Sequence, residues 1–229
     1  MNRRRLLMNG GFPREPSEYE LLQKYTAAGT FTAPKKGWYQ IEVHGASGNG
    51  GEPYDLEGKT TGDLYRYTLT SGGGGGGGGY ACSRVRLEKD DTVTFTPGKV
   101  GAISSASIFS TIEEYEDMAV TSGGNGGKAK GASTVVGTGG VASGGNYENA
   151  NGKNGNRQSK SDTIASGEEE IYAVVKGAGG AAGHSGGNAG GNGEGCVYDT
   201  SQYIDDVFTV TPATKGSAGF IKIYRGNKN

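Results

Sequence analysis

The chain has 229 residues, of which 33% are hydrophobic and 9% aromatic, and its 23 Lys and Arg side chains nearly balance its 24 Asp and Glu, for a formal net charge of −1. This balance provides no general electrostatic attraction to nucleic acid or to an anionic membrane, and the apolar runs are far too short for membrane insertion. The hydrophobic content is lean for a conventional core. Because of this low content, something besides apolar burial must stabilise the fold. Glycine, with 46 residues, is the most unusual component of the sequence.

The N-terminal 20 residues predict a polar arm. They contain Arg3, Arg4 and Arg5 followed by two prolines, and they show neither helical nor strand periodicity. No signal-peptide core follows the arginines. We expect an extended tether in residues 1–20 and a single domain in residues 21–229.

Alternation of apolar and polar residues predicts half-buried antiparallel strands along this domain. In residues 38–44, Tyr39, Ile41 and Val43 fall on one face of such a strand. The same pattern recurs at residues 83–88, 92–96, 208–211 and 220–224. Because strands lie at both ends of the sequence, the pattern indicates an all-β protein built on an antiparallel β-sandwich.

Five glycine-rich tracts interrupt these strands, at residues 45–51, 72–79, 123–131, 137–145 and 177–195. Such tracts form either flexible loops or extended helices with three residues per turn, which pack backbone against backbone. We favour packed helices because long structureless loops are uncommon inside a compact domain. Collagen is excluded, since the chain lacks a sustained Gly-X-Y period and has only six prolines.

The sequence offers no convincing catalytic, cofactor or metal motif. The Gly-x-Gly-x-x-Gly matches do not open a helix after a strand, as a dinucleotide site requires, and the residues around Gly127 and Lys128 do not complete a phosphate loop. The acidic clusters at residues 113–117 and 168–170 match no calcium loop. Cys82 and Cys196 lack zinc-site spacing, and they are either ordinary thiols or one long-range disulfide. His44 and His184 are expected to be structural rather than bases for a cysteine nucleophile. We therefore expect a protein that is not an enzyme and holds no cofactor or metal.

Tyrosine is frequent, with 13 residues, and many of them sit in the segments that interrupt the strands. Tyr, Gly, Ser and Asn together are typical of adaptable binding loops, although tyrosines can also pack over the ends of a sandwich. Residues 52–70 and 146–170 are polar enough to be display loops. The candidate receptor-binding residues are Tyr54, Tyr65, Tyr147 and Arg157.

Several short motifs resemble the glycine-rich proteins of bacteriophages and prophages. They are residues 29–34, residues 37–46, the poly-glycine with Tyr80 and Ala81, and residues 219–224. The first eight residues are also similar to the starts of phage structural proteins of that group. The layout resembles the glycine-rich domain of the anaplastic lymphoma kinase receptor, in which a sandwich similar to tumour necrosis factor carries a bundle of polyglycine helices. Glycine-helix bundles also form the receptor-binding tips of some phage long tail fibres.

The resemblance implies a virion protein of the tail or fibre, made in the bacterial cytoplasm and released by lysis. It would bind other virion proteins through the arm with Arg3, Arg4 and Arg5, assemble as a homotrimer, and present loops to a host-surface carbohydrate or protein. The alternatives are a head-decoration or tail-spacer protein without receptor affinity and a bacterial surface adhesin. A depolymerase would need paired carboxylates in a cleft, which the sequence does not place.

Overall fold

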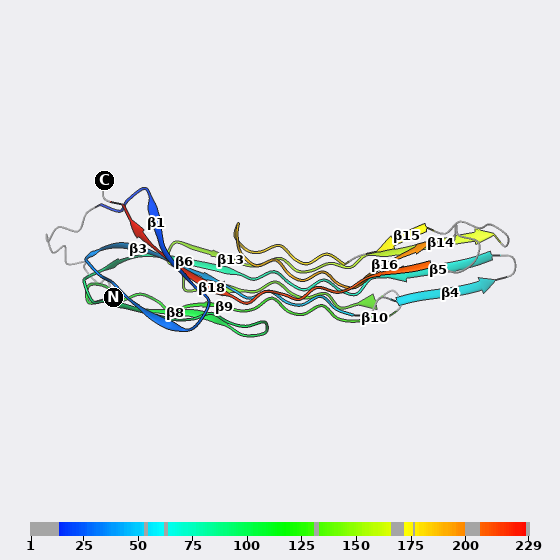
Figure 1. Cartoon of the computed structure of the whole chain (residues 1–229), viewed down its shortest axis with the longest axis horizontal. Coiled ribbons are helices and arrows are strands. Elements are labelled where there is room, and N and C mark those ends of the chain that lie inside the picture. The colour runs from blue at the N-terminus through cyan, green and yellow to red at the C-terminus, as the bar shows by residue number, and fades with distance from the viewer. Residues whose placement is uncertain are drawn as a thin grey trace, which may run out of the picture.

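The computed structural model describes residues 14–52, 55–61, 64–130, 133–165, 172–175, 177–199 and 207–227. Every regular element within these residues is a β-strand, and every sheet is antiparallel, so the predicted all-β class is confirmed. The molecule is elongated, with two large sheets at one end, wavy extended runs in the middle and smaller sheets at the other end (Figure 1). No helix in the described part of the chain is long or apolar enough to span a bilayer.

Two five-stranded sheets form the end that holds the first and last strands. Sheet A has the order β1-β18-β3-β6-β13, and sheet B has the order β12-β9-β8-β7-β2. The strands of sheet A are β1 (Tyr19–Tyr25), β3 (Gly37–His44), β6 (Tyr80–Leu87), β13 (Glu148–Ala150) and β18 (Phe220–Gly226). Those of sheet B are β2 (Gly29–Thr32), β7 (Thr92–Thr96), β8 (Ser104–Phe109), β9 (Met118–Val120) and β12 (Ala142–Ser143).

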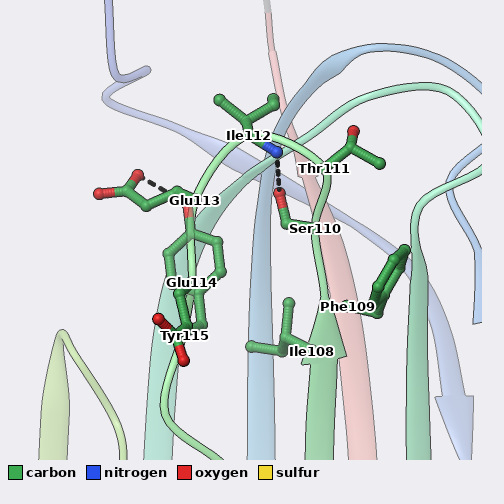
Figure 2. A pocket seen from close by; sticks show the side chains of 8 residues that line it. All are labelled: Ile108, Phe109, Ser110, Thr111, Ile112, Glu113, Glu114 and Tyr115. Atoms are coloured by element: carbon green, nitrogen blue, oxygen red, sulfur yellow. Dashed lines mark hydrogen bonds between the residues drawn. The ribbon is translucent and has the colours of Figure 1, made fainter. Parts of the chain in front are cut away.

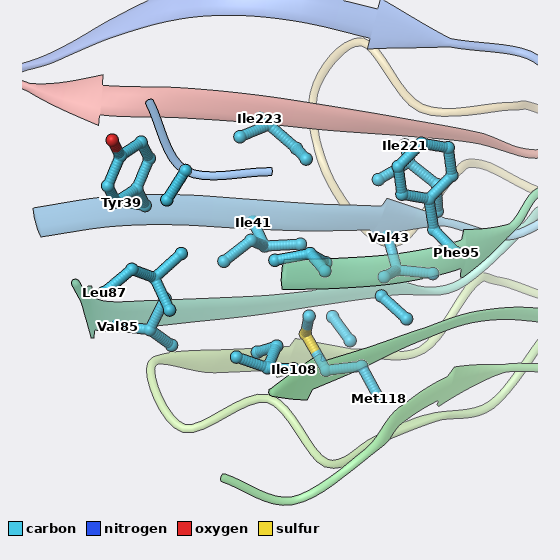
Figure 3. Close-up of a cluster of buried hydrophobic side chains, with 14 of the residues drawn as sticks. Tyr39, Ile41, Val43, Val85, Leu87, Phe95, Ile108, Met118, Ile221 and Ile223 are labelled. Carbon is cyan, nitrogen blue, oxygen red and sulfur yellow. The ribbon is translucent and has the colours of Figure 1, made fainter. Parts of the chain in front are cut away.

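Sheets A and B enclose a common hydrophobic core (Figure 3). The predicted inward face of β3 is confirmed, because Tyr39, Ile41 and Val43 are fully buried. Met118 and Phe95 enter the same core from sheet B. This end of the molecule is therefore a β-sandwich with a conventional apolar interior. Its other core residues are Ala33, Ala81, Val85, Leu87, Val93, Ala106, Ile108, Val120, Ile221 and Ile223.

Eight extended runs without helix or strand assignment connect the sandwich to the far end, and we call them the glycine bundle (Figure 1). The chain passes outward and back four times, so every outward run is followed by a returning one. The runs are residues 45–51, 71–79, 121–128, 135–141, 151–158, 177–183, 188–194 and 212–219.

The run of eight glycines lies at the centre of this bundle. Seven consecutive N–H groups, from residues 72–78, donate to three neighbouring runs in rotation, so that every third amide bonds to the same neighbour. Seven consecutive carbonyls, from residues 73–79, accept from three further runs in the same rotation. The central run thus has six neighbours, three of them acceptors and three donors. The acceptors of residues 72–78 are Glu194, Gly127, Asn156, Gly191, Gly124, Lys153 and Asn188.

The missing side chains permit this close approach. A Cβ atom on any of residues 72–78 would meet a backbone carbonyl oxygen of a neighbouring run; at Gly75 it would meet the carbonyl of Gly48. Neighbouring backbones therefore occupy the space that side chains would take. The central run is buried along its whole length although it carries no apolar side chain.

Two small three-stranded sheets close the end opposite the sandwich, and we call them the distal sheets (Figure 1). Sheet C has the order β14-β5-β4, and sheet E has the order β15-β16-β17. Their strands are β4 (Asp55–Thr61), β5 (Leu64–Thr70), β14 (Ser159–Ala165), β15 (Tyr172–Val175), β16 (Gly195–Asp199) and β17 (Val207–Thr211). A short hairpin of β10 (Ala129–Lys130) and β11 (Ser133–Thr134) lies at the same end.

The structure refines the predicted boundaries. β1 begins at Tyr19, and Pro16 is buried, so the last residues of the predicted arm belong to the sandwich. Residues 1–13, with Arg3, Arg4 and Arg5, lie outside the described residues. The predicted tract at residues 177–195 is two runs, because a turn at residues 184–187 reverses the chain.

Candidate functional site

The two predicted display segments, residues 52–70 and 146–170, meet at the distal sheets. β5 pairs with β14 along its whole length, which places Tyr65 opposite Ile164 and Thr70 opposite Ser159. The hydroxyls of Thr70 and Ser159 lie 2.9 Å apart. β4 pairs with the other edge of β5. These polar segments therefore form an antiparallel sheet held away from the sandwich, rather than two separate loops.

Part of the second display segment serves the glycine bundle instead. Asn151, Asn154 and Asn156 are exposed, as their composition predicts, but their side-chain oxygens accept hydrogen bonds from backbone N–H groups at 2.6–3.0 Å. The donors to Asn154 and Asn156 lie in neighbouring runs, and the donor to Asn151 is the first residue of β12. An amide side chain thus replaces a missing backbone neighbour at the rim of the bundle.

The predicted receptor-binding residues lie at both ends of the molecule. Tyr65 is on β5 in the distal sheets, and the exposed Arg157 lies just before β14. Tyr147 lies beside β13 in the sandwich, and the extended run at residues 151–158 carries the chain from there to β14 at the opposite end. Tyr54 lies outside the described residues. The structure therefore brings Tyr65 and Arg157 to one end and does not join Tyr147 to them.

Tyr147 packs against an arginine on the outer face of sheet A. The Arg84 guanidinium carbon lies 3.6 Å from the centre of the Tyr147 ring and 4.9 Å from that of Tyr19. Arg84 also donates through Nε to Gln40 at 3.0 Å and through Nη1 to Glu15 at 3.1 Å. The hydrogen bonds hold the Arg84 guanidinium in place, and a cation–π interaction attracts the Tyr147 ring to it.

A pocket of about 260 Å³ opens beside this pair, and we call it the Arg84 pocket. The Asn146 side chain, on one side of the pocket, bonds to strand β6: it accepts from the backbone N–H of Arg84 at 2.9 Å and donates to the Arg84 carbonyl at 3.0 Å. Glu113 accepts from Arg86 at 2.9 Å and from the Tyr115 hydroxyl at 3.1 Å. The pocket is lined by Glu15, Trp38, Arg84, Glu113, Tyr115, Asn146 and Tyr147.

A second pocket, of about 390 Å³, lies within the loop between β8 and β9, and we call it the loop pocket (Figure 2). Ser110 closes the loop, since its Oγ accepts from the Ile112 N–H at 3.3 Å and donates to the carbonyl of Arg86 at 3.0 Å. Phe109 is 65% exposed beside it. Glu113 and Tyr115 line both pockets, so the two hollows adjoin.

A buried polar network lies on the same outer face of sheet A, nearer the bundle. Glu42 accepts from Tyr224 at 3.0 Å and from Gln40 at 2.9 Å, and its Oε2 lies 3.1 Å from Nε2 of His44. The His44 ring stacks on Phe220 with centroids 4.2 Å apart. The sequence pattern had placed Glu42 and His44 on the polar face of the strand, but it gave no sign that this face is also covered.

The network lowers the pKa of both His44 and Glu42. Burial lowers the pKa of His44, and this effect outweighs the neighbouring Glu42 carboxylate, which raises it. Burial alone would raise the pKa of Glu42, but hydrogen bonds and charge from His44, together with the hydrogen bonds from Tyr224 and Gln40, hold it below its ordinary value. The pair is therefore a neutral imidazole beside an ionised carboxylate at neutral pH.

Cys82 is a buried free thiol on the adjacent strand. Burial raises its pKa to about 12, which is opposite to the shift that a nucleophilic cysteine needs. Of the two open alternatives for the cysteines, the structure has the free thiol at Cys82. The side chain of Cys196 lies outside the described residues.

Among the described residues, no group of three or more His, Cys, Asp and Glu side chains is arranged to hold a metal ion. Comparisons with known proteins add no relative: no protein family, curated protein or solved structure matches the chain.

Proposed function

We propose that the protein is a structural component of a phage virion, in the tail or fibre, and that its distal sheets face the host surface. One observation carries this proposal: the chain crosses the glycine bundle eight times, holding its first and last strands at one end and the predicted display strands at the other. Such a layout suits a spacer between an attachment end and a binding end. The phage resemblance of the sequence motifs supports the same interpretation.

The bundle, in this proposal, consists of polyglycine II helices, and the sandwich is of the tumour-necrosis-factor type. The three-residue rotation of the hydrogen bonds supports the first part, because an extended helix with three residues per turn presents every third residue to the same neighbour. In such a helix the N–H groups point in three directions and the carbonyls point in three others, so one helix can bond to six neighbours. A cross-linked bundle of this kind is stiff, as a spacer requires.

The sandwich end is the proposed attachment end. Residues 1–20, with Arg3, Arg4 and Arg5, lead into β1, where Leu21 and Leu22 are 48% and 43% exposed. Exposed apolar side chains on an edge strand suit contact with another protein. The proposed partners are other virion proteins and two further copies of this chain in a homotrimer.

The distal end is the proposed receptor end, with Tyr65 and Arg157 as candidate contacts for a carbohydrate or protein. Tyr54, which lies outside the described residues, remains a candidate from the sequence. Purified protein binding to whole bacterial cells tests this assignment. The double variant Tyr65→Ala/Arg157→Ala should bind at least about tenfold more weakly, as the loss of aromatic and arginine contacts predicts. Phe109→Ala, which removes an exposed aromatic ring from the sandwich end, is the matched control and should bind normally.

The outcome separates the alternatives. Normal binding by the double variant, with an unchanged melting temperature, would support a head-decoration or tail-spacer role without receptor affinity. A loss confined to Phe109→Ala would move the receptor contact to the sandwich end. Detection of the protein in the bacterial envelope, and not in purified particles, would favour the surface adhesin.

A further inference from the structure

The Arg84 pocket joins aromatic faces to polar groups on the outer side of sheet A. Trp38 precedes the core residue Tyr39, and Arg84 precedes the core residue Val85, so strand alternation turns Trp38 and Arg84 away from the sandwich interior. Tyr147 closes the pocket and is 55% exposed. Trp38, Tyr115 and Tyr147 thus bring three aromatic rings to one small hollow.

The charges of the pocket compensate one another. Glu15 pairs with Arg84 at 3.1 Å, and Glu113 pairs with Arg86 at 2.9 Å. A phosphate would meet two carboxylates, and a metal cation would meet the Arg84 guanidinium, so this lining favours a ligand without charge. A carboxylate has about four lone-pair sites, so Glu15 can accept a hydroxyl in addition to Arg84, and Glu113 can accept one in addition to Arg86 and Tyr115.

The volume limits the ligand to a single ring. Sites for drug-sized ligands measure about 300–1,000 Å³, and the Arg84 pocket, at about 260 Å³, falls below that range. A sugar ring has an apolar C–H face and a rim of hydroxyl groups, which matches aromatic rings beside paired carboxylates. We propose that the Arg84 pocket binds one neutral sugar ring, packed against the rings of Tyr147 and Trp38 with its hydroxyls on Glu15 and Glu113. This assignment is independent of which end of the molecule meets the receptor.

The chain offers a direct reporter, because Trp38 is its only tryptophan. Wild-type protein is titrated with glucose, galactose, mannose and N-acetylglucosamine while tryptophan fluorescence is recorded. At least one sugar should give a saturable change and protect the indole from acrylamide quenching. Tyr147→Ala should weaken that sugar about tenfold. Phe109→Ala, an exposed aromatic outside the Arg84 pocket, should titrate like the wild type.

Three results would overturn the proposal: no saturable response to any sugar in the panel, an undiminished response in Tyr147→Ala, or a response only to a proline-rich peptide, which would make the pocket a peptide site. Melting curves check that each variant folds. Should Tyr147→Ala melt early, Glu15→Gln, whose side chain lies at the surface, gives the second measurement and should also weaken the sugar. Cell adsorption of the distal variants is measured separately, so either proposal can fail alone.

Discussion

At Gly75, a methyl group would occupy the place where the backbone of Gly48 and Asn49 now lies. Relief requires two runs of the bundle to separate, because backbone atoms cannot rotate away as a side chain can. Overpacking costs about 1–3 kcal/mol, and separated runs also lose hydrogen bonds of about 1 kcal/mol each. We expect Gly75→Val to lower the free energy of unfolding by several kcal/mol, measured by chemical or thermal denaturation.

Gly37→Ala is the matched control. A Cβ atom there would meet only the Arg225 side chain, at 3.9 Å, which is an ordinary contact. This variant should unfold within about 1 kcal/mol of the wild type. Equal stability of the Gly75 and Gly37 variants would mean that the central run is a loose segment, contrary to its place in the bundle.

A second prediction at the residue scale concerns pH. The folded-state pKa of His44 lies below its ordinary value of 6.5, so acid protonates the unfolded chain first and stability is lost as the pH falls below about 6.5. Glu42, whose pKa lies below 4.5, adds a further loss at still lower pH. The melting temperature of the wild type should therefore fall between pH 7.5 and pH 5.5, the interval in which the histidine dominates.

His44→Gln removes the titration while keeping an amide that can donate to Glu42. Its melting temperature should change less over the same interval, even if it starts lower. An identical slope in wild type and variant would place the acid sensitivity elsewhere. Should the variant fail to fold, an NMR titration of the wild-type imidazoles reports the same quantity, and a His44 pKa at or above 6.5 would contradict the prediction.

At the scale of the element, the eight glycines of the central run have no side chains, yet seven of their N–H groups and seven of their carbonyls have backbone partners in neighbouring runs. All seven N–H groups of residues 72–78 donate to neighbouring runs within a buried interior. Amide hydrogen exchange should therefore protect these glycines as strongly as the strands β3 and β6. Exchange within seconds, as in exposed loops, would contradict the packed arrangement. Gly186, in the exposed turn at residues 184–187 with φ 77°, gives the fast-exchanging reference.

The strands of the sandwich follow from the sequence because one face meets an apolar core. Alternation at residues 38–44, 83–88 and 92–96 predicts the buried sides of β3, β6 and β7. The opposite face of sheet A was not predictable in the same way. Glu42 and His44 look like solvent-facing residues in the pattern, but Tyr80, Phe220 and His184 cover the histidine.

The glycine bundle was predictable only where glycine dominates the local sequence. Residues 151–158 and 212–219 were missed, because a run at the rim needs glycine only where it faces a neighbour. Gly152 and Gly155 are spaced by three and approach the carbonyls of Gly77 and Gly74. A search for glycine at every third position, instead of for dense tracts, would have found both runs, because Gly216 and Gly219 repeat this spacing.

At the scale of the whole molecule, the candidate binding residues show the limit of reading a sequence in segments. Residues 52–70 and 146–170 share a polar composition, and the structure brings β5 and β14 together from them. Tyr147 belongs to the second segment but lies in the sandwich, because the run at residues 151–158 separates it from β14. Residues close in sequence were therefore wrongly expected to lie together, because the chain crosses the whole bundle between them.

The arm is anchored more tightly than its composition indicates. Glu15 pairs with Arg84, Pro16 lies against Gly226, and β1 begins at Tyr19. Removing residues 1–20 would therefore damage sheet A as well as the arm. A cut after residue 13 leaves each of these contacts in place and still removes Arg3, Arg4 and Arg5.

The final prediction uses this difference. A chain lacking residues 1–13 should melt at the wild-type temperature, because no contact in the described residues is lost, whereas a chain lacking residues 1–20 should melt earlier. If the arginines dock the protein, the shorter deletion already abolishes incorporation into the particle, as quantitative electrophoresis of purified virions would measure. A folded protein without residues 1–13 that reaches the normal copy number would show that attachment depends on the sandwich itself, with the exposed Leu21 and Leu22 of β1 as the next candidates.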